Sequence, residues 1–222
     1  MGKGTVSAMT GLSEDEVVAV SSPGVGPHPL PWPDDPRLDP ELLAEGDRRN
    51  VPDEYRYWRL EAIVAELDTR RLPLQVAIQN WEHDFNIGSI VRTANAFNVE
   101  RLHIIGRRRW NRRGAMVTDR YLHLEHHATT AEFLAWLAEH DVAPIGVDNL
   151  PGSVPLESTQ LPQRCCLIFG SEGPGLTDEV VAGCEQLVAI TQYGSTRSLN
   201  AGAAAAIAMY HWALQWAPRN AG

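Results

Sequence analysis

Apolar and polar positions alternate in short runs from about residue 72 to the end of the chain. Five short apolar runs bounded by polar, glycine or proline residues predict β-strands, at residues 74–80, 101–106, 143–148, 164–170 and 186–191. Segments with helical character lie between and after them, at residues 87–98, 129–140 and 177–184 and from about Ser198 onward. This alternation predicts an α/β fold with a mostly parallel sheet that has helices on both faces.

The N-terminal part of the chain has a different composition. The stretch "SSPGVGPHPLPWPDDPRLDP", residues 21–40, is too rich in proline for the interior of a helix or strand, so we expect residues 1–40 to be a mostly disordered or extended N-terminal extension. A helical N-terminal segment is expected within residues 41–72, because "PDEYRYWRLEAIVAELDTRR" places five apolar residues on one face: Tyr57, Leu60, Ile63, Val64 and Leu67. This helix could cover the core or contribute to an oligomer contact, and residues 73–222 would form the main domain.

Composition excludes several classes of protein. The chain has 222 residues, of which 44% are hydrophobic and 21% charged, as is typical of a globular domain. Its apolar runs are shorter than the roughly 18 residues of a membrane span, and its start does not resemble a secretory signal. The three cysteines make neither a disulfide framework nor a zinc site, because Cys165 and Cys166 are adjacent in an apolar run. We therefore expect a cytoplasmic protein with no membrane partner.

Basic residues are concentrated in one segment of an acidic chain. The net charge is −9, yet "GRRRWNRRG" places five arginines around one tryptophan. Guanidinium groups pair with phosphate and an indole stacks on bases, so this segment is a candidate RNA-binding surface. A solvated basic loop is the alternative. The candidate residues are Arg107, Arg108, Arg109, Trp110, Arg112 and Arg113.

Ligands of parallel α/β folds bind outside the carboxyl ends of the strands. The loops that follow the first, fourth and last predicted strands there read "NWEHDFNIGSIVR", "GSEGPGL" and "QYGSTRSLN". The glycines of the second loop would let backbone groups approach a ligand closely, which suits an adenine or a ribose. A tight turn with a helix cap is the other interpretation of that loop.

Taken together, three ordered motifs resemble those of the SpoU family of RNA ribose 2′-O-methyltransferases, in the SPOUT superfamily. They are "NIGSIVRTANAF" (86–97), "LIFGSEGPGL" (167–176) and "ITQYGSTRSLNAGAAAAI" (190–207), and the resemblance runs from about Leu74 to the end. It implies an α/β fold with a deep C-terminal trefoil knot, a pocket for S-adenosylmethionine, an RNA substrate and a homodimer. We favour tRNA over rRNA, because no folded N-terminal RNA-recognition domain is evident.

The resemblance also assigns roles to individual residues. It implies a catalytic set with two members in the first motif, one in the second and two in the third: Asn86, Arg92, Glu172, Ser198 and Asn200. It implies cofactor contacts at Gly170, Ile190 and Leu199. The chain departs from many family members at Thr191 and Gln192, where they have proline and methionine.

Arg92 is the residue on which the implied chemistry depends most. The family's arginine is sometimes proposed to be the general base, but a guanidinium with a pKa above about 12 hardly releases its proton. An electrostatic clamp on the neighbouring phosphate, which lowers the effective pKa of the 2′-hydroxyl, is the interpretation that we prefer. A surface arginine on a helix is the structural alternative.

Two further patterns need an explanation. The last helix starts with Gly202 among alanines, which would permit close packing in a knot, although an ordinary buried alanine-rich helix explains the alanines equally well. Histidines at His103 and within "HLEHH", residues 123–127, do not complete a metal-binding pattern. We predict no metal, and contact with RNA is an alternative role for these histidines.

The sequence thus predicts an S-adenosylmethionine-dependent RNA 2′-O-methyltransferase. A non-catalytic RNA-binding protein on the same scaffold is the alternative from a different class, and the presence of Arg92, Glu172, Ser198 and Asn200 argues against it. A nucleotide-binding α/β protein unrelated to RNA is a third hypothesis, which the arginine-rich segment disfavours.

Overall fold

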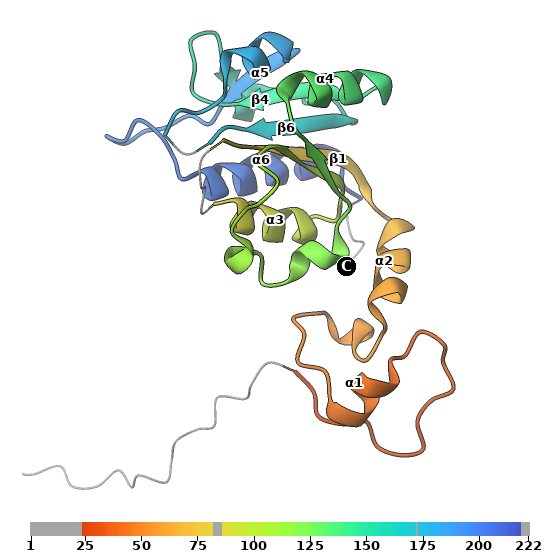
Figure 1. Cartoon of the computed structure of the whole chain (residues 1–222). Helices are drawn as coiled ribbons and strands as arrows, with labels where there is room; N and C mark the ends of the chain where they lie inside the picture. Colours follow the sequence, from red (N-terminus) through yellow and green to blue (C-terminus); the bar gives the residue numbers. More distant parts are fainter. Residues whose placement is uncertain (1–23, 82–85, 172, 219–222) are drawn as a thin grey trace, which may run out of the picture. The chain divides into compact units, whose positions relative to one another are not determined.

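The computed structural model describes residues 24–81, 86–171 and 173–218. The chain forms two compact units, Met1–Tyr57 and Trp58–Gly222, and each is described by itself (Figure 1). The division therefore falls at Tyr57 and Trp58, whereas the sequence pattern places boundaries at residues 40 and 72. The predicted boundaries of the N-terminal extension and the methyltransferase domain, at residues 40 and 72, therefore stay predictions.

The first unit is organised around a buried carboxylate. Asp47 is fully buried and accepts hydrogen bonds from the Arg49 guanidinium at 2.7 and 2.9 Å and from the Tyr57 backbone N–H at 3.0 Å. Burial raises the pKa of Asp47, but these hydrogen bonds outweigh it and hold the pKa below its usual value. The unit contains helix α1, Pro40–Glu45, and the 3₁₀ helix η1, Asp53–Tyr55.

The predicted helix between residues 52 and 71 is interrupted. Tyr57 adopts a left-handed backbone with φ 63°, and the regular helix α2 begins only at Leu60 and ends at Asp68. The hydrogen bond from the Tyr57 N–H to the Asp47 carboxylate accompanies this break. Periodicity alone could not reveal that tertiary contact. Of the predicted N-terminal extension, residues 24–39 contain no helix, and residues 1–23 lie outside the described part of the chain.

A seven-stranded sheet forms the centre of the second unit. Its strands are β1 (Leu72–Asn80), β2 (Val99–Gly106), β3 (Leu124–His127), β4 (Ala143–Val147), β5 (Val154–Pro155), β6 (Cys165–Phe169) and β7 (Gln186–Ala189). They are arranged in the order β3-β2-β1-β6-β4-β7-β5, and each neighbouring pair is parallel. The predicted mostly parallel α/β sheet is confirmed.

Helices cover both faces of this sheet (Figure 1). The side chains of Leu74, Val76 and Ile78 on β1 join one apolar cluster with α3 and α6, and the alternate residue Ala77 joins a second cluster with α4 and α5. This two-residue period is the one expected of a strand that is buried on both faces. The helices are α3 (Ile87–Ala96), α4 (Thr130–Glu139), α5 (Asp178–Gly183) and α6 (Ala201–Trp216), and the short 3₁₀ helices are η2 (Arg112–Ala115), η3 (Thr118–Tyr121) and η4 (Leu156–Ser158).

The histidine-rich segment is an unpredicted edge strand, β3. His103 on β2 is fully buried, and its Nδ1 lies 3.0 Å from Nε2 of His127 on β3 while its Nε2 lies 2.8 Å from Oε1 of Gln75. Burial, with His127 and Arg101 nearby, lowers the pKa of His103 to about 3. His103 and His127 are therefore buried core residues, and the alternative that these two contact RNA is wrong.

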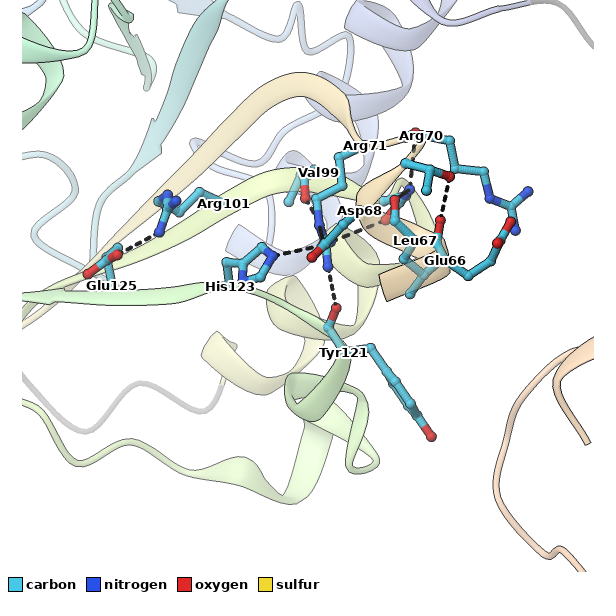
Figure 2. Close-up of polar contacts among 12 residues, drawn as sticks. Glu66, Leu67, Asp68, Arg70, Arg71, Val99, Arg101, Tyr121, His123 and Glu125 are labelled. Carbon is cyan, nitrogen blue, oxygen red and sulfur yellow. Dashed lines mark hydrogen bonds and ion pairs between the residues drawn. The ribbon is translucent and has the colours of Figure 1, made fainter. Parts of the chain in front are cut away.

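An arginine fastens the end of α2 to the sheet. Figure 2 shows Arg71, whose guanidinium bonds to Asp68 at 2.6 Å and to the carbonyl oxygens of Val99 at 3.3 Å and Tyr121 at 2.9 Å. His123 bonds to the same Asp68 carboxylate at 2.8 Å. Although its partial burial acts in the opposite direction, these two partners hold the pKa of Asp68 below its usual value. The network ties α2 to β2 and to the segment that precedes β3.

The cysteines belong to the core and have no partner cysteine. Cys165 and Cys166 on β6 are buried and Cys184 is half-buried, and all three are free thiols. Burial raises the pKa of Cys165 to about 12 and that of Cys184 to about 11, and it raises the pKa of Cys166 well above the usual value. Across the described residues, each helix is too short or too polar to pass through a bilayer.

Candidate functional site

A cleft of about 400 Å³ opens at the carboxyl ends of β4, β6 and β7 and at the start of α6. Small-molecule sites have volumes of about 300–1,000 Å³, so a ligand of that class can enter. The three predicted cofactor contacts all line the cleft, as do the predicted catalytic residues Ser198 and Asn200. The residues at its wall are Val147, Asp148, Asn149, Phe169, Gly170, Ser171, Gly173, Gly175, Ile190, Gln192, Ser198, Leu199, Asn200, Ala201 and Ala204.

One wall is a glycine loop, which in the described chain comprises residues 170, 171 and 173–175 and brings its two ends close together. A Cβ atom on Gly170 would lie 2.0 Å from the carbonyl carbon of Gly175, so a side chain cannot be accommodated at Gly170 without a shift of the backbone. Gly175 has φ 73°, and a Cβ there would lie 2.4 Å from Oδ2 of Asp148. Gly170 and Gly175 are thus required by close contacts within the protein, with the Gly175 backbone and the Asp148 side chain. The approach of this backbone to a ligand stays a prediction.

Buried polar side chains fix the glycine loop against β1. Ser171 donates its hydroxyl to the carbonyl oxygen of Gln79 at 3.0 Å. The Gln79 side chain, which is fully buried, donates to the Thr177 hydroxyl at 2.8 Å and accepts from the Thr177 N–H at 3.0 Å. Gln79 is therefore a positioning residue that sequence reasoning missed. Its position in an apolar strand was the available signal.

The charge of the cleft favours a cationic ligand. The described lining residues include one carboxylate, Asp148, and no lysine or arginine. Asp148 accepts backbone hydrogen bonds from Leu176 at 2.9 Å and from Asn149 at 2.7 Å, which orient it. A carboxylate, carbonyl oxygens and apolar side chains suit a molecule that carries an adenine, a sulfonium and an ammonium group. The residues present therefore fit S-adenosylmethionine.

Asp148 and Asn149 were also missed by the sequence analysis. They directly follow β4, at the same edge of the sheet as the three loops that the sequence analysis considered. The rule that ligands bind beyond the carboxyl ends of parallel strands would have included this loop too.

Two asparagines from distant motifs meet beside the cleft. The Asn200 amide donates to Oδ1 of Asn86 at 2.7 Å, which joins the first and third motifs. Asn200 also caps α6, because its Oδ1 accepts from the Ala203 N–H at 3.2 Å. Asn86 stands at the start of α3 and is buried. Asn200 therefore combines a helix cap with a direct contact between the first and third motifs.

Helix α6 approaches α3 closely at Gly202. A Cβ on Gly202 would lie 2.4 Å from the Ser89 hydroxyl oxygen and 3.1 Å from Oδ1 of Asn200. Ala205 and Ala208 are fully buried on the same helix. Small residues at the start of α6 therefore allow the approach that the sequence indicated, and Gly202 is the position where the approach is tightest.

The other predicted catalytic residues have different surroundings. Ser198 is exposed at the edge of the cleft. Arg92 lies on α3 with an exposed side chain and is not among the residues that line the cleft. Glu172 lies outside the described residues.

The two residues that depart from the family pattern each make a side-chain hydrogen bond. The Thr191 hydroxyl donates to the Glu157 carboxylate on η4, and this hydrogen bond is the leading cause that lowers the pKa of Glu157. Gln192 lines the cleft and accepts from the Thr196 hydroxyl at 3.4 Å. Thr191 therefore joins the loop after β7 to η4.

The predicted RNA-binding residues lie in one segment that runs from the end of β2 into η2, the arginine segment, residues 107–113. All five arginine side chains are exposed. Trp110 is half-buried and packs against the apolar cluster of α3 and α6, and the Arg112 guanidinium lies 5.5 Å from its ring centroid. The structure therefore directs the indole partly inward. Among the described residues there is no group of three or more histidine, cysteine, aspartate or glutamate side chains that could hold a metal ion.

Comparison with known proteins gives one consistent class. The family model described as "SpoU rRNA Methylase family" matches residues 73–210. The tRNA (guanosine(18)-2′-O)-methyltransferase of Escherichia coli strain K12 is 26% identical over 153 residues, which cover 67% of each chain.

Solved structures agree with this family match. The TrmH/SpoU tRNA modifying enzyme of A. aeolicus superposes with a TM-score of 0.63 at 23% identity, covering 71% of this chain and 82% of its own, which shows a shared fold. The SpoU methyltransferase AviRb of Streptomyces viridochromogenes, in complex with the cofactor AdoMet, gives a TM-score of 0.58 at 25% identity, covering 66% of this chain and 58% of its own.

The chain belongs to the SpoU rRNA Methylase family. This membership confirms the family predicted from the three motifs. With the named relatives it also confirms the predicted class, an RNA methyltransferase that uses S-adenosylmethionine.

Proposed function

We propose that this protein transfers a methyl group from S-adenosylmethionine to a ribose 2′-hydroxyl of RNA, and that the RNA is tRNA. The observation that carries the proposal is the cleft at the start of α6, where the predicted cofactor contacts meet and where Asn200 bonds to Asn86 of the first motif. The preference for tRNA is supported by the tRNA-modifying relatives in E. coli and A. aeolicus.

The cofactor supplies an electrophilic methyl group on a positively charged sulfur. Backbone groups of the glycine loop, with Ile190 and Leu199, hold the cofactor in the cleft, and the Asp148 carboxylate stabilises its positive charge. Holding the methyl group and the 2′-oxygen in line at about 3–3.5 Å is the main catalytic task of the site. Asn86 and Asn200 keep the two motifs in register for that task.

In this proposal the reacting ribose is oriented by polar side chains at the edge of the cleft. Ser198, exposed there, contacts the substrate, and Glu172 belongs to the catalytic set through its motif. Arg92 grips the neighbouring phosphate and its positive charge stabilises the developing alkoxide, so that the hydroxyl proton passes more easily to solvent water. Its exposed position on α3 leaves the guanidinium available to RNA.

The proposal includes a homodimer. Three large apolar side chains are exposed on α6 at helical spacing: Ile207 at 43%, Tyr210 at 57% and Leu214 at 59%. Residues three and four positions apart lie on one face of a helix, so they form a stripe that a second copy of α6 can cover. Light scattering at micromolar concentration tests this, and Tyr210→Glu is expected to shift the mass from dimer to monomer.

The proposal also includes a C-terminal trefoil knot. Its supports are the family motifs and the packing of α6 on α3 at Gly202, beside the cleft that the glycine loop and the loop after β7 share. A cytoplasmic location is proposed as well, since the cellular RNA substrates are there and the three cysteines are free.

Two measurements test the enzymatic function. Calorimetry is expected to show S-adenosylmethionine binding that EDTA does not alter, and Gly170→Ala is expected to abolish it because of the clash with Gly175. Mass spectrometry of nucleosides from a deletion strain is expected to show a missing 2′-O-methylnucleoside in tRNA. RNA binding without cofactor binding or methyl transfer would instead support the non-catalytic RNA-binding protein.

A further inference from the structure

Two consecutive apolar residues after the arginine segment point outward from a strained turn. Met116 and Val117 have left-handed backbones, with φ 49° and 66°, and their exposed fractions are 55% and 54%. A β-branched residue rarely takes this conformation, and it persists only where the surrounding structure enforces it. We call Met116 and Val117 the apolar tip.

The residues on each side of the apolar tip are anchored. Ala115 and Thr118 are buried, and the Thr118 hydroxyl donates to the Ala115 carbonyl oxygen at 2.7 Å. Gly114 packs on the first turn of α3 so closely that a Cβ on Gly88 would lie 2.8 Å from the Gly114 Cα. The turn therefore presents the two apolar side chains from a fixed base.

The arginine segment that precedes the tip is also held by its backbone. The buried Asn80 side chain, at the end of β1, donates to the carbonyl oxygens of Arg107 at 2.6 Å and Arg109 at 3.0 Å. The Asn111 side chain caps the turn that follows by accepting from the Arg113 N–H at 3.0 Å. Guanidinium groups are thus displayed from an ordered backbone, which reduces the entropy lost when they bind phosphates.

Cationic side chains surround the tip in an otherwise acidic protein. Arg112 pairs with the buried Asp119 at 3.2 Å. Other exposed arginines nearby make no ion pair with a described residue, and they are Arg107, Arg108, Arg109, Arg113 and Arg120. The local charge therefore complements a polyanion, although the whole chain has a net charge of −9.

A chain of contacts leads from the apolar tip to the cleft. The turn packs on Gly88, and Asn86, two residues earlier, bonds to Asn200 at the wall of the cleft. The tip is therefore connected to the cleft through the start of α3. Trp110, which would otherwise be the residue to stack on a base, packs against the core instead.

We propose that the apolar tip packs against an unpaired nucleobase of the RNA substrate, close to the methylated ribose, while the surrounding arginines bind the flanking phosphates. The inference rests on the proposed function and specifies its substrate class as unpaired nucleotides in a loop or bulge. Base faces are stacked on each other in an A-form duplex, and only an unpaired base offers its apolar face to a side chain. A paired helix would leave Met116 and Val117 without a partner.

The experiment compares two RNAs of equal length and charge, a hairpin with an unpaired loop and a fully paired duplex. Equilibrium binding is measured for the native protein and for a double variant, Met116→Ser with Val117→Asn. Asparagine tolerates the left-handed backbone, so the variant is expected to keep the thermal stability of the native protein. Hairpin affinity is expected to fall about tenfold, as for the loss of one base contact, with duplex affinity and salt dependence unchanged.

Matched variants separate the tip from general effects. Leu30→Ser removes an apolar side chain that is 80% exposed in the other unit, and it is expected to change neither affinity. Met116→Leu keeps an apolar surface and is expected to retain hairpin binding. A double variant that binds the hairpin like the native protein, or that loses both RNAs equally, would overturn the inference alone. A native protein that binds neither RNA would overturn the proposed function together with it.

Discussion

The arginine segment and the C-terminal loop, residues 191–200, both follow strands at the same edge of the sheet, yet they are held in different ways. The arginine segment has its backbone bound by the buried Asn80 side chain and its end packed on α3 at Gly88. The C-terminal loop is almost entirely exposed. It is joined to the rest of the domain near its start by Thr191 to Glu157, and near its end by the Asn149 amide to the Arg197 carbonyl oxygen at 3.4 Å and by Asn200 to Asn86.

This difference indicates a division of roles. An RNA-binding surface gains affinity when its cationic groups are already ordered, because less entropy is lost on binding. A cofactor wall that is fixed at its ends can adjust to the ligand between them, with few contacts to break. Substitutions in the first region should therefore change RNA affinity, and substitutions around the cleft should change cofactor binding or the chemical step.

Arg92→Ala should have the largest effect and gives the strictest test of this division. Loss of an electrostatic contact made in the transition state costs on the order of 10²–10³ in rate, and cofactor affinity is expected to stay unchanged. Single-turnover methylation at saturating RNA measures the rate, and Arg120→Ala is the matched exposed arginine. A normal rate for Arg92→Ala would remove Arg92 from the catalytic set.

Replacing Arg107, Arg108 and Arg109 together with alanine should act on affinity instead. Each lost phosphate contact removes about one unit from the slope of log affinity against log salt, so the slope is expected to fall by about three. Binding titrations at several salt concentrations measure it. The single-turnover rate at saturating RNA is expected to survive, and its loss would show that the arginine segment takes part in chemistry.

The anchoring of the arginine segment can be tested separately from its charge. Asn80→Ala leaves two carbonyl oxygens without their donor, and a loss of about 1–3 kcal/mol in unfolding free energy is expected, with weaker RNA binding and unchanged cofactor affinity. Asn149→Ala, at the wall of the cleft, is the corresponding variant in the other region. It is expected to weaken cofactor binding while RNA binding stays the same. Denaturant titration and calorimetry distinguish them. If both variants changed RNA binding and cofactor binding in the same way, the two regions would not have separate roles.

A pH dependence of stability is expected from a site outside both regions. Burial holds the pKa of His103 at about 3, below its unfolded value of about 6.5, so the unfolded chain binds a proton that the folded chain excludes. Stability is therefore full above pH 6.5 and is lost as the pH falls toward 3, by about 2 kcal/mol between pH 7.5 and 5. Denaturant titrations at both pH values measure the loss. His103→Gln is expected to flatten it, and an equally steep loss in that variant would assign the effect to other groups.

Much of the fold could be predicted because its signals are local. The five strands with apolar runs and the helices between them were all predicted, with ends that differ by no more than three residues. The short strands β3 and β5 were missed, since Leu124–His127 is polar and Val154–Pro155 has two residues, and both are strands only because a neighbouring strand offers hydrogen-bonding partners. Edge strands of this kind have little pattern of their own.

The candidate site, like the fold, could be predicted from the sequence only in part. The motifs correctly brought together Gly170, Ile190 and Asn200, because their order along the chain is linked to one fold. The inward packing of Trp110 and the exposure of Met116 and Val117 depend on how the segment after β2 lies on α3. That contact joins residues far apart in sequence, and composition favoured the tryptophan as the exposed group.

The burial of the three cysteines has a practical consequence for spectroscopy. Thiol-reactive probes attack the thiolate, and the raised pKa values of Cys165, Cys166 and Cys184 leave almost none of it at neutral pH. The natural chain is thus expected to react little with such probes, so that a cysteine introduced at the surface can be labelled selectively. A fluorophore attached through Met116→Cys would respond selectively at the apolar tip, and its quenching would report each encounter with a nucleobase in real time.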